Sequence, residues 1–322
     1  MPPKYDDLAS ANPPYSSWEY FGRDDQRGTI NFLTPARVAA AAQLIRTGKQ
    51  FGLDYAVNAF EPYPTGTRPA TEHHVFANNE FHRDDWVDSF YLQSTTQVDS
   101  LRHIGHPSHG FYNGRPSSSN NASSTDLGIH VWAETGIAGR GVLLDIERFF
   151  PGPDYHYEET IPLDASVLDA VAAEQGVTFS GGEILLLHTG WASHYLGASA
   201  ADRARIKNTS PGLAQRTEVV RWLWDHEIAL VASDNLAVEA DPVVESDFRI
   251  PGAQPPERGT NHDGMLHRPL IALLGMAMGE MWKLDELAAD CAADGRYDFF
   301  LTCKPLHLIG GVGSPANAIA LK

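Results

Sequence analysis

Short apolar runs alternate with helical patterns along most of the chain. Runs of consecutive apolar residues at 141–145, 183–188 and 228–234 predict buried strands. Apolar side chains at helical spacing predict amphipathic helices at 164–175 and 212–225. Strands that alternate with helices are typical of the α/β class, so we expect an α/β fold.

The N-terminal third carries further signals. Thr34 and Pro35 suit the start of a helix that ends at Gly48. Residues 50–58 and 89–101 look extended, and they are separated by a charged stretch and by a turn region rich in proline and glycine.

Glycines predict a reversal in the C-terminal part. In one unbroken helix, His267 and Glu280 would lie roughly 20 Å apart along the axis. Gly275 is a natural helix breaker, so we expect a short helix that ends there and a reversal that brings Glu280 back. A helix at 285–293 and a strand at 298–302 follow.

No linker divides the chain, so we expect one domain over 31–322, preceded by an arm at 1–30. The arm is rich in Pro, Tyr and Asp. It either lies on the protein or on a neighbouring subunit, or it is a partly disordered terminus. The low-complexity segment 116–125 is either an exposed connector or a mobile lid.

Charge narrows the range of partners. The 322 residues include 24 Lys and Arg against 41 Asp and Glu, which gives a formal charge of −17. Such a negative field makes nucleic acid and anionic membranes poor partners. Two cysteines are too few for a disulfide framework, and no run approaches the roughly 18 apolar residues of a membrane span. We therefore expect a cytoplasmic protein that acts on a small molecule.

Polar side chains gather at 93–103. Alternate side chains of an extended backbone share a face, so Gln93, Gln97, Asp99 and His103 form a polar face. A strand against an apolar core would show apolar residues at this spacing. The face is therefore either solvated or functional.

Side chains suited to a divalent metal such as zinc or manganese recur along the chain. They are Asp99, His103, His106, His109, His267 and Glu280. No pair forms a strong local motif, so solvated polar side chains and a histidine-rich loop are the alternative. Asp234, Asn235 and Glu239 follow a buried strand and are either site residues or a polar turn. A serine nucleophile is disfavoured, because the Gly-x-Ser-x-Gly elbow is absent.

These residues resemble a known family, the cyclase or kynurenine formamidase-like metal-dependent hydrolases, which includes isatin hydrolases and trans-dienelactone hydrolase. The family signature His-x-Gly-Thr-His-x-Asp-x-Pro-x-His corresponds to residues 93–103. Further matching stretches span nearly the whole chain: 28–35, 111–114, 139–145, 188–191, 233–239, 267 with 280, and 313–315. The resemblance implies the family's swivelling β/β/α-like fold, with a mixed sheet or barrel-like core surrounded by helices, and a homo-oligomer, either dimer or tetramer.

The resemblance also implies roles for individual residues. Asp99, His267 and Glu280 stand where the family has metal ligands. His103 stands where it has the histidine that transfers protons.

Two glutamines depart from the signature. Gln93 and Gln97 replace its first two histidines, and a carboxamide oxygen is a weaker, harder donor than imidazole. Along a regular strand Gln97 lies about 6.6 Å from Asp99, whereas Gln93 lies about 20 Å from it. We therefore expect one divalent ion, Zn or Mn, rather than two. Gln97 and water would complete a site of Asp99, His267 and Glu280, with Gln93 as a further candidate ligand.

Such a centre implies hydrolysis of a cyclic amide, a lactone or a related carbonyl bond in a small ring-containing molecule. The metal would polarise the carbonyl and activate water, and His103 would accept the proton of that water. Phe90, Phe111 and Tyr112 are either apolar walls for the substrate or core aromatics, and His106 is placed with them on the substrate side. Two alternatives are a non-catalytic binding protein with a degenerate metal site and a metal-assisted cyclase or dehydratase.

Overall fold

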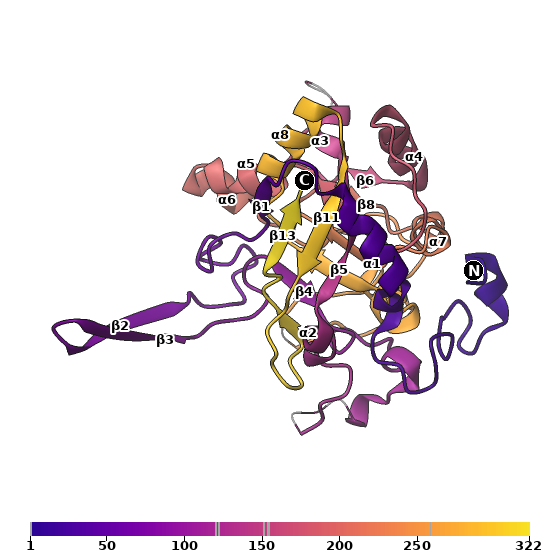
Figure 1. Cartoon of the computed structure of the whole chain (residues 1–322). Coiled ribbons are helices and arrows are strands. Elements are labelled where there is room, and N and C mark those ends of the chain that lie inside the picture. Colours follow the sequence, from indigo (N-terminus) through magenta and orange to yellow (C-terminus); the bar gives the residue numbers. More distant parts are fainter. Residues whose placement is uncertain (1, 120, 122, 151, 153–154, 258) are drawn as a thin grey trace.

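A curled sheet lies at the centre of the molecule, and helices surround it (Figure 1). The computed structural model describes residues 2–119, 121, 123–150, 152, 155–257 and 259–322. Within these residues the sheet has nine strands in the order β1-β13-β11-β5-β7-β9-β10-β4-β12. Their bounds are β1 Gln50–Gly52, β4 Gln97–Asp99, β5 Ile137–Asp145, β7 Glu183–His188, β9 Leu230–Ser233, β10 Ala277–Glu280, β11 Asp298–Cys303, β12 Gly313–Ser314 and β13 Ala318–Leu321.

Four central strands, β5, β7, β9 and β10, run parallel, so their carboxyl ends lie at one edge of the sheet. The remaining strands are antiparallel to their neighbours. Parallel strands covered on both faces are uniformly apolar, and residues 184–187 are fully buried. The α/β class is confirmed, as are the strands predicted at 141–145, 183–188, 228–234 and 298–302.

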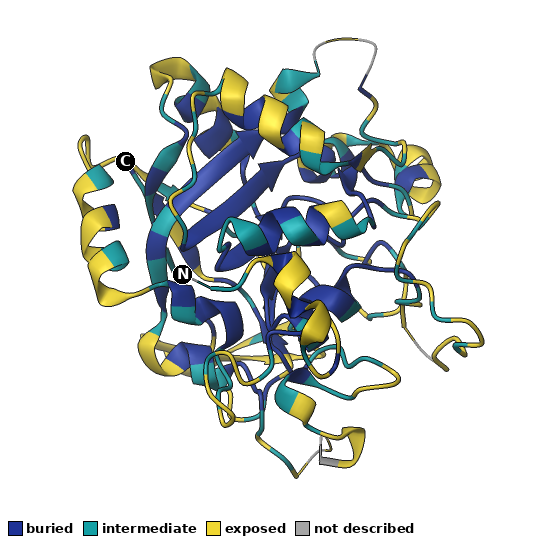
Figure 2. Cartoon of the chain, turned by 90° about the vertical axis from the view of Figure 1, so that its right-hand side faces the viewer, coloured by how far each residue is buried: buried dark blue, intermediate teal, exposed yellow. Residues whose placement is uncertain are grey.

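Helices pack around the sheet with one face buried and the other exposed (Figure 2). Their bounds are α1 Pro35–Ala41, α2 His130–Thr135, α3 Ile146–Phe149, α4 Ala165–Glu174, α5 Trp191–Gly197, α6 Ala200–Ile206, α7 Thr217–Asp225 and α8 Asp285–Asp294. The side chains of Thr34 and Asp164 cap α1 and α4 by accepting backbone N–H bonds from Arg37 and Val167. In the part of the chain that is described, no helix is long and apolar enough to cross a membrane.

The N-terminal arm lies on α7 of its own chain. The backbone N–H of Tyr5 donates to Oδ1 of Asp225 at 2.8 Å, and the indole N–H of Trp224 donates to the carbonyl of Pro3 at 2.9 Å. Both partners belong to α7, so the start of the arm packs on the protein's own surface.

The strand predicted at 89–101 is wrong over most of its length. Residues 92–96 form a turn and bends, and only β4 is extended. The hydroxyl of Thr96 donates to the carbonyl of Met281 at 2.6 Å and accepts from the backbone N–H of Tyr55 at 2.9 Å. Such bonds from a side chain to the backbone compete with a regular ladder. The extended stretch predicted at 50–58 is likewise a strand only along β1.

The helix predicted at 212–225 is also shorter, because α7 begins at Thr217. Residues 212–213 instead form β8, which pairs in parallel with β6, Pro162–Leu163. The helix predicted up to Gly48 ends with α1 and a single 3₁₀ turn.

A hairpin that the sequence did not predict projects from the body of the molecule (Figure 1). It consists of β2, Glu72–Asn79, and β3, His82–Asp88, paired antiparallel. Nearly all of its residues are exposed. Because neither face packs on the core, its sequence lacks the apolar alternation that identifies a strand.

The low-complexity segment 116–125 includes residues 120 and 122, which lie outside the described part of the chain. The guanidinium group of Arg102 donates hydrogen bonds to the carbonyls of Asn121 and Ser124. These bonds hold described parts of the segment near the end of the signature stretch.

Candidate metal centre

The register of two neighbouring strands places polar side chains together. β10 pairs with β4 so that Glu280 lies opposite Gln97 and Met278 opposite Asp99. Opposed residues, and residues two apart on one strand, share a face of the sheet. Gln97, Asp99 and Glu280 therefore lie on the same face, and all three are buried.

His267 reaches this face from the residue that precedes η7, Arg268–Leu273, a short π-helix. Gly275, with a φ of +63°, ends the turn and lets β10 return beside it, at the position where the sequence predicts a reversal. The Nδ1 atom of His267 lies 2.8 Å from Oε1 of Glu239, and its Nε2 atom lies 3.1 Å from Oε1 of Glu280.

Glu239 holds His267 in one orientation. Its carboxylate accepts the backbone N–H of Leu266 at 2.6 Å and that of His267 at 3.3 Å. With Nδ1–H directed at Glu239, Nε2 faces Glu280. Burial opposes a charged ring, but the hydrogen bonds to Glu239 and Glu280 raise the pKa of His267 to about 10. A carboxylate behind the imidazole is the arrangement that usually supports a metal-binding histidine.

The donor set fits a divalent cation. One ligand atom each from Asp99, His267 and Glu280 lie within 4.8 Å of one another. Gln97 donates a hydrogen bond to Glu280, while its own Oε1 and the Oδ2 of Asp99 are buried without a hydrogen-bond partner. Burial and the charge of Glu280 raise the pKa of Asp99 to about 8. A cation between these oxygens would satisfy both and remove the repulsion.

Two more histidine rings border the centre. The ring of His262 lies 5.9 Å from that of His103 and 5.1 Å from that of His267, between centroids. Burial and the nearby charge of His267 lower the pKa of His262 to about 3 and that of His103 well below 6.5. Both rings are therefore neutral, and each keeps a lone pair that can accept a proton.

Gln93 lies beside Asp99 rather than about 20 Å away, because the chain turns at 92–96 instead of continuing as a strand. Its amide donates to Oδ1 of Asp99, and the same nitrogen lies 3.1 Å from Nδ1 of His103. Gln93 thus joins the predicted ligand to the predicted proton-transfer histidine. Its amide nitrogen faces Asp99, so Gln93 orients the ligand.

A cavity of about 690 Å³ opens over the centre. Its lining includes Gln97, His103, His267 and Glu280. Arg68 lines it as well. This volume is in the range of pockets for small organic ligands.

Arg68 brings a positive charge to the cavity wall. Its guanidinium carbon lies 4.3 Å above the ring centre of Tyr63, which also lines the cavity. The Nη1 atom of Arg68 is buried, and within the described part of the chain it has no hydrogen-bond partner. A donor group in this state can bind an anionic ligand.

The residues predicted to line the substrate side lie elsewhere. Phe90, Phe111, Tyr112 and His106 are not among the residues that line this cavity. Tyr112 is fully buried, and its hydroxyl donates to Oδ2 of Asp25 at 3.1 Å. His106 stacks on His109 in the loop, with ring centroids 4.6 Å apart. These side chains are close to the signature in sequence, but they pack outside the cavity.

Sequence reasoning missed two residues of the site. His262 was available as a signal, because it lies five residues before His267 in the same polar stretch. Arg68 lies in the turn region rich in proline and glycine, where no periodicity indicates the direction of a side chain. Glu239 was predicted as a possible site residue, and the structure places it behind the imidazole of His267.

The fold is that of a known class of proteins. The family described as "Putative cyclase" matches residues 39–240. A crystal structure described as a novel cyclase is 33% identical, with a TM-score of 0.79, and covers 95% of this chain and 99% of that chain. The chain belongs to the cyclase family, and the mixed, curled sheet is the fold that the sequence resemblance implied.

More distant structures share the fold. Isatin hydrolase A from Ralstonia solanacearum is 15% identical, with a TM-score of 0.58, and covers 90% of this chain and 98% of that chain. Isatin hydrolase A from Labrenzia aggregata, bound to benzyl benzoate, is also 15% identical, with a TM-score of 0.56, and covers 88% of this chain and 96% of that chain. No curated protein matches the sequence.

We expect Glu239→Gln to weaken divalent-ion binding about 10–100-fold, because His267 loses the carboxylate that orients it. Calorimetric titration of chelator-treated protein with zinc or manganese measures this. Glu218→Gln, on the exposed surface of α7, is the control and should bind as the unaltered protein does. Unchanged affinity in the Glu239→Gln variant would show that His267 does not depend on this contact.

Proposed function

We propose that the protein is a metal-dependent hydrolase that opens a cyclic amide, a lactone or a related carbonyl bond in a small ring-containing molecule. The observation that carries this proposal is the convergence of Asp99, His267 and Glu280 at the wall of a cavity that His267, Glu280 and His103 line. The name of the isatin hydrolases refers to a cyclic amide fused to an aromatic ring, which makes such amides the first substrates to test.

One divalent ion, zinc or manganese, would be held by Asp99, His267 and Glu280, with Gln97 Oε1 as a further donor. When bound, the ion supplies a Lewis acid that polarises a carbonyl oxygen and lowers the pKa of water. The chain itself fixes the donors through Glu239 and the strand register, so the cost of ordering them is met by folding.

His103 is the proposed general base. Its ring is neutral and lines the cavity, with Nε2 3.8 Å from Oδ2 of Asp99. Its Nδ1 is held by the Gln93 side chain. In the tautomer of this neutral ring that is protonated at Nδ1, the lone pair on Nε2 is free to take a proton from water and return it to the leaving group.

Arg68 is the proposed anchor for the product. Opening a lactone or a cyclic amide creates a carboxylate, and the buried Nη1 of Arg68 is a donor with no hydrogen-bond partner among the described residues. A charge-assisted hydrogen bond to that carboxylate contributes roughly 1.5–3 kcal/mol.

The replacement of two histidines by Gln93 and Gln97 favours a second candidate, a binding protein of the same fold without catalysis. Elemental analysis of protein purified without chelators separates the two. Absence of a stoichiometric metal, with no activation by added zinc or manganese, would establish the binding protein.

We expect His103→Ala to lower kcat about 10²–10⁴-fold with the metal content unchanged, because only the proton acceptor is lost. Asp99→Asn should lose the activity and the ion held at this centre. A panel of lactones, cyclic imides and N-formyl arylamines provides the substrates, and metal content is measured on the same samples. His109→Ala, in the exposed loop, is the control. Full activity in His103→Ala, or full metal content in Asp99→Asn, would refute the assigned roles.

We expect Arg68→Ala to raise the inhibition constant of the ring-opened carboxylate product at least about tenfold, from the loss of a charge-assisted bond. Product inhibition is measured with the best substrate from the panel. Arg46→Ala, which removes an exposed arginine outside the cavity, should leave the constant unchanged. Equal inhibition in the Arg68→Ala variant would exclude this anchor.

The projecting hairpin supports the proposal that the protein is a homo-oligomer, a dimer or a tetramer. Phe81 is 90% exposed, Val75 63% and Trp86 48%. An isolated two-stranded hairpin is marginally stable in water, and its free edges invite pairing. A second copy packed against it would cover these side chains.

We expect the double variant Phe81→Asp, Trp86→Asp to dissociate the oligomer, because two charges replace its apolar contact. Sedimentation velocity measures the assembly state of both proteins. Ile309→Asp, at a 60% exposed position in another loop, is the matched control and should assemble normally. An unaltered protein that sediments as a monomer would refute the oligomer.

A further inference from the structure

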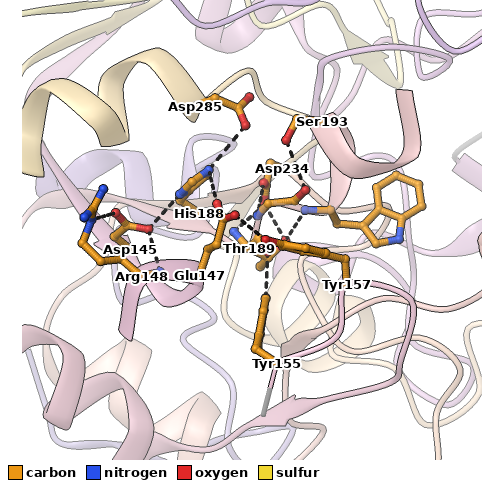
Figure 3. Close-up of polar contacts among 12 residues, drawn as sticks. Asp145, Glu147, Arg148, Tyr155, Tyr157, His188, Thr189, Ser193, Asp234 and Asp285 are labelled. Carbon is orange, nitrogen blue, oxygen red and sulfur yellow. Dashed lines mark hydrogen bonds and ion pairs between the residues drawn. The ribbon is translucent and has the colours of Figure 1, made fainter. Parts of the chain in front are cut away.

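A second group of ligand-type side chains surrounds His188, apart from the centre described above (Figure 3). Asp145 ends β5 and His188 ends β7, so both lie at the carboxyl edge of the parallel strands. Glu147 belongs to α3, and Asp285 is the first residue of α8. All four line a cavity of about 480 Å³. Ligands commonly bind at this edge of a parallel sheet.

The imidazole of His188 is fixed from one side. Its Nδ1 lies 2.9 Å from Oδ1 of Asp145. Asp145 is itself held by the backbone N–H and Nε of Arg148, at 3.3 and 3.2 Å. His188 is 4% exposed, and its Nε2 has no hydrogen-bond partner among the residues that the structure describes. With Nδ1–H directed at Asp145, the lone pair of Nε2 is left free.

Two carboxylate oxygens face that lone pair. Oε2 of Glu147 lies 3.5 Å from Nε2 of His188, and Oδ1 of Asp285 lies 3.6 Å from it. Neighbouring ligand atoms of a tetrahedral ion with bonds of about 2.0–2.1 Å are roughly 3.4 Å apart. Both separations are therefore close to those of two ligands on one ion.

Each facing carboxylate is held by its other oxygen. The hydroxyl of Tyr157 donates to Oε1 of Glu147, and the hydroxyl of Tyr55 donates to Oδ2 of Asp285 at 3.2 Å. Both side chains are 36% exposed, so they are open to the cavity and to an entering ion. In metal sites, the ligating side chains are typically held by hydrogen bonds from a second layer of residues.

Asp234 adds negative charge without joining the ligands. Its Oδ1 accepts the backbone N–H and the hydroxyl of Thr189, at 2.8 and 2.6 Å, and its Oδ2 accepts the N–H of Gly190 at 2.7 Å. Both oxygens are thus occupied by the turn that follows β7.

The alternative to a bound cation is a doubly protonated His188, whose positive charge would balance the carboxylates. Burial disfavours the charged ring, but Asp145 and Asp285 raise the pKa of His188 to about 10. An imidazolium N–H donating to a carboxylate would lie about 2.7–2.9 Å from the oxygen. The separations of 3.5 and 3.6 Å at Nε2 exceed this range, which favours a cation between the groups.

We propose that this second cluster binds one divalent cation that accepts imidazole and carboxylate ligands, through His188 Nε2 and the carboxylate of Glu147, with Asp285 adding negative charge close to the ion. Zinc is the probe of choice, since it combines these donors in open sites. The ion would tie α3 to the end of β7. The site shares no residue with the centre at Asp99, so it does not depend on the proposed reaction.

The test counts zinc equivalents on the full-length, chelator-treated protein by calorimetric titration, with cobalt as a spectroscopic probe. Asp99→Asn isolates the second cluster, and we expect this variant to bind one zinc. Adding Glu147→Gln should weaken that binding at least tenfold, and adding His188→Asn should abolish it. Glu159→Gln, an exposed glutamate nearby, is the matched control and should change nothing.

Circular dichroism confirms that each variant is folded. The Glu147→Gln arm keeps the test decisive if the buried His188→Asn variant does not fold. An Asp99→Asn protein that binds no zinc, or one whose zinc is unaffected by Glu147→Gln, overturns the proposal.

Discussion

Two carboxylates buried side by side constrain the whole active region. Asp99 is fully buried and Glu280 is 5% exposed, and each would lose much of its hydration on folding. One imidazole, His267, lies between Glu280 and a third buried carboxylate, Glu239. A cluster of buried carboxylates is stable only if positive charge balances its negative charge. The proposed divalent cation would provide that balance, with the side-chain oxygen of Gln97 as a neutral donor.

The backbone enforces this arrangement. A slip of one residue between β4 and β10 would turn Gln97 and Asp99 to the opposite face of the sheet. The turn before β10 is locked by the N-terminal region, since Thr29 donates its N–H to the carbonyl of Gly275 at 2.8 Å. A Cβ on Gly28 would lie 1.8 Å from that same oxygen, so only glycine permits the approach. A segment distant in sequence thus sets the position of Glu280.

The two clusters use the same physical design. In each, one carboxylate holds Nδ1 of a buried histidine, and Nε2 faces further carboxylate oxygens. Fixing the ring from behind limits its rotation and directs the remaining lone pair. The difference lies in access: Glu239 is fully buried, whereas Glu147 and Asp285 face a cavity.

The sequence by itself determined the α/β class, the buried strands and the side chains with metal chemistry. Apolar runs and helix caps are local properties, so 183–188 and the helix at 164–175 could be predicted directly. The breaker at Gly275 also predicted that His267 and Glu280 would meet. The signature resemblance supplied Asp99 and His103 as candidates.

Only the tertiary structure decided how these residues combine. Gln93 lies beside Asp99 because side-chain bonds bend the chain at 92–96, and local periodicity does not record such bonds. Arg68 and His262 come from irregular loops, whose side-chain directions are set by packing across the cavity. The cluster at His188 joins ends of strands and helices far apart in the chain, because parallel strands gather their carboxyl ends at one edge.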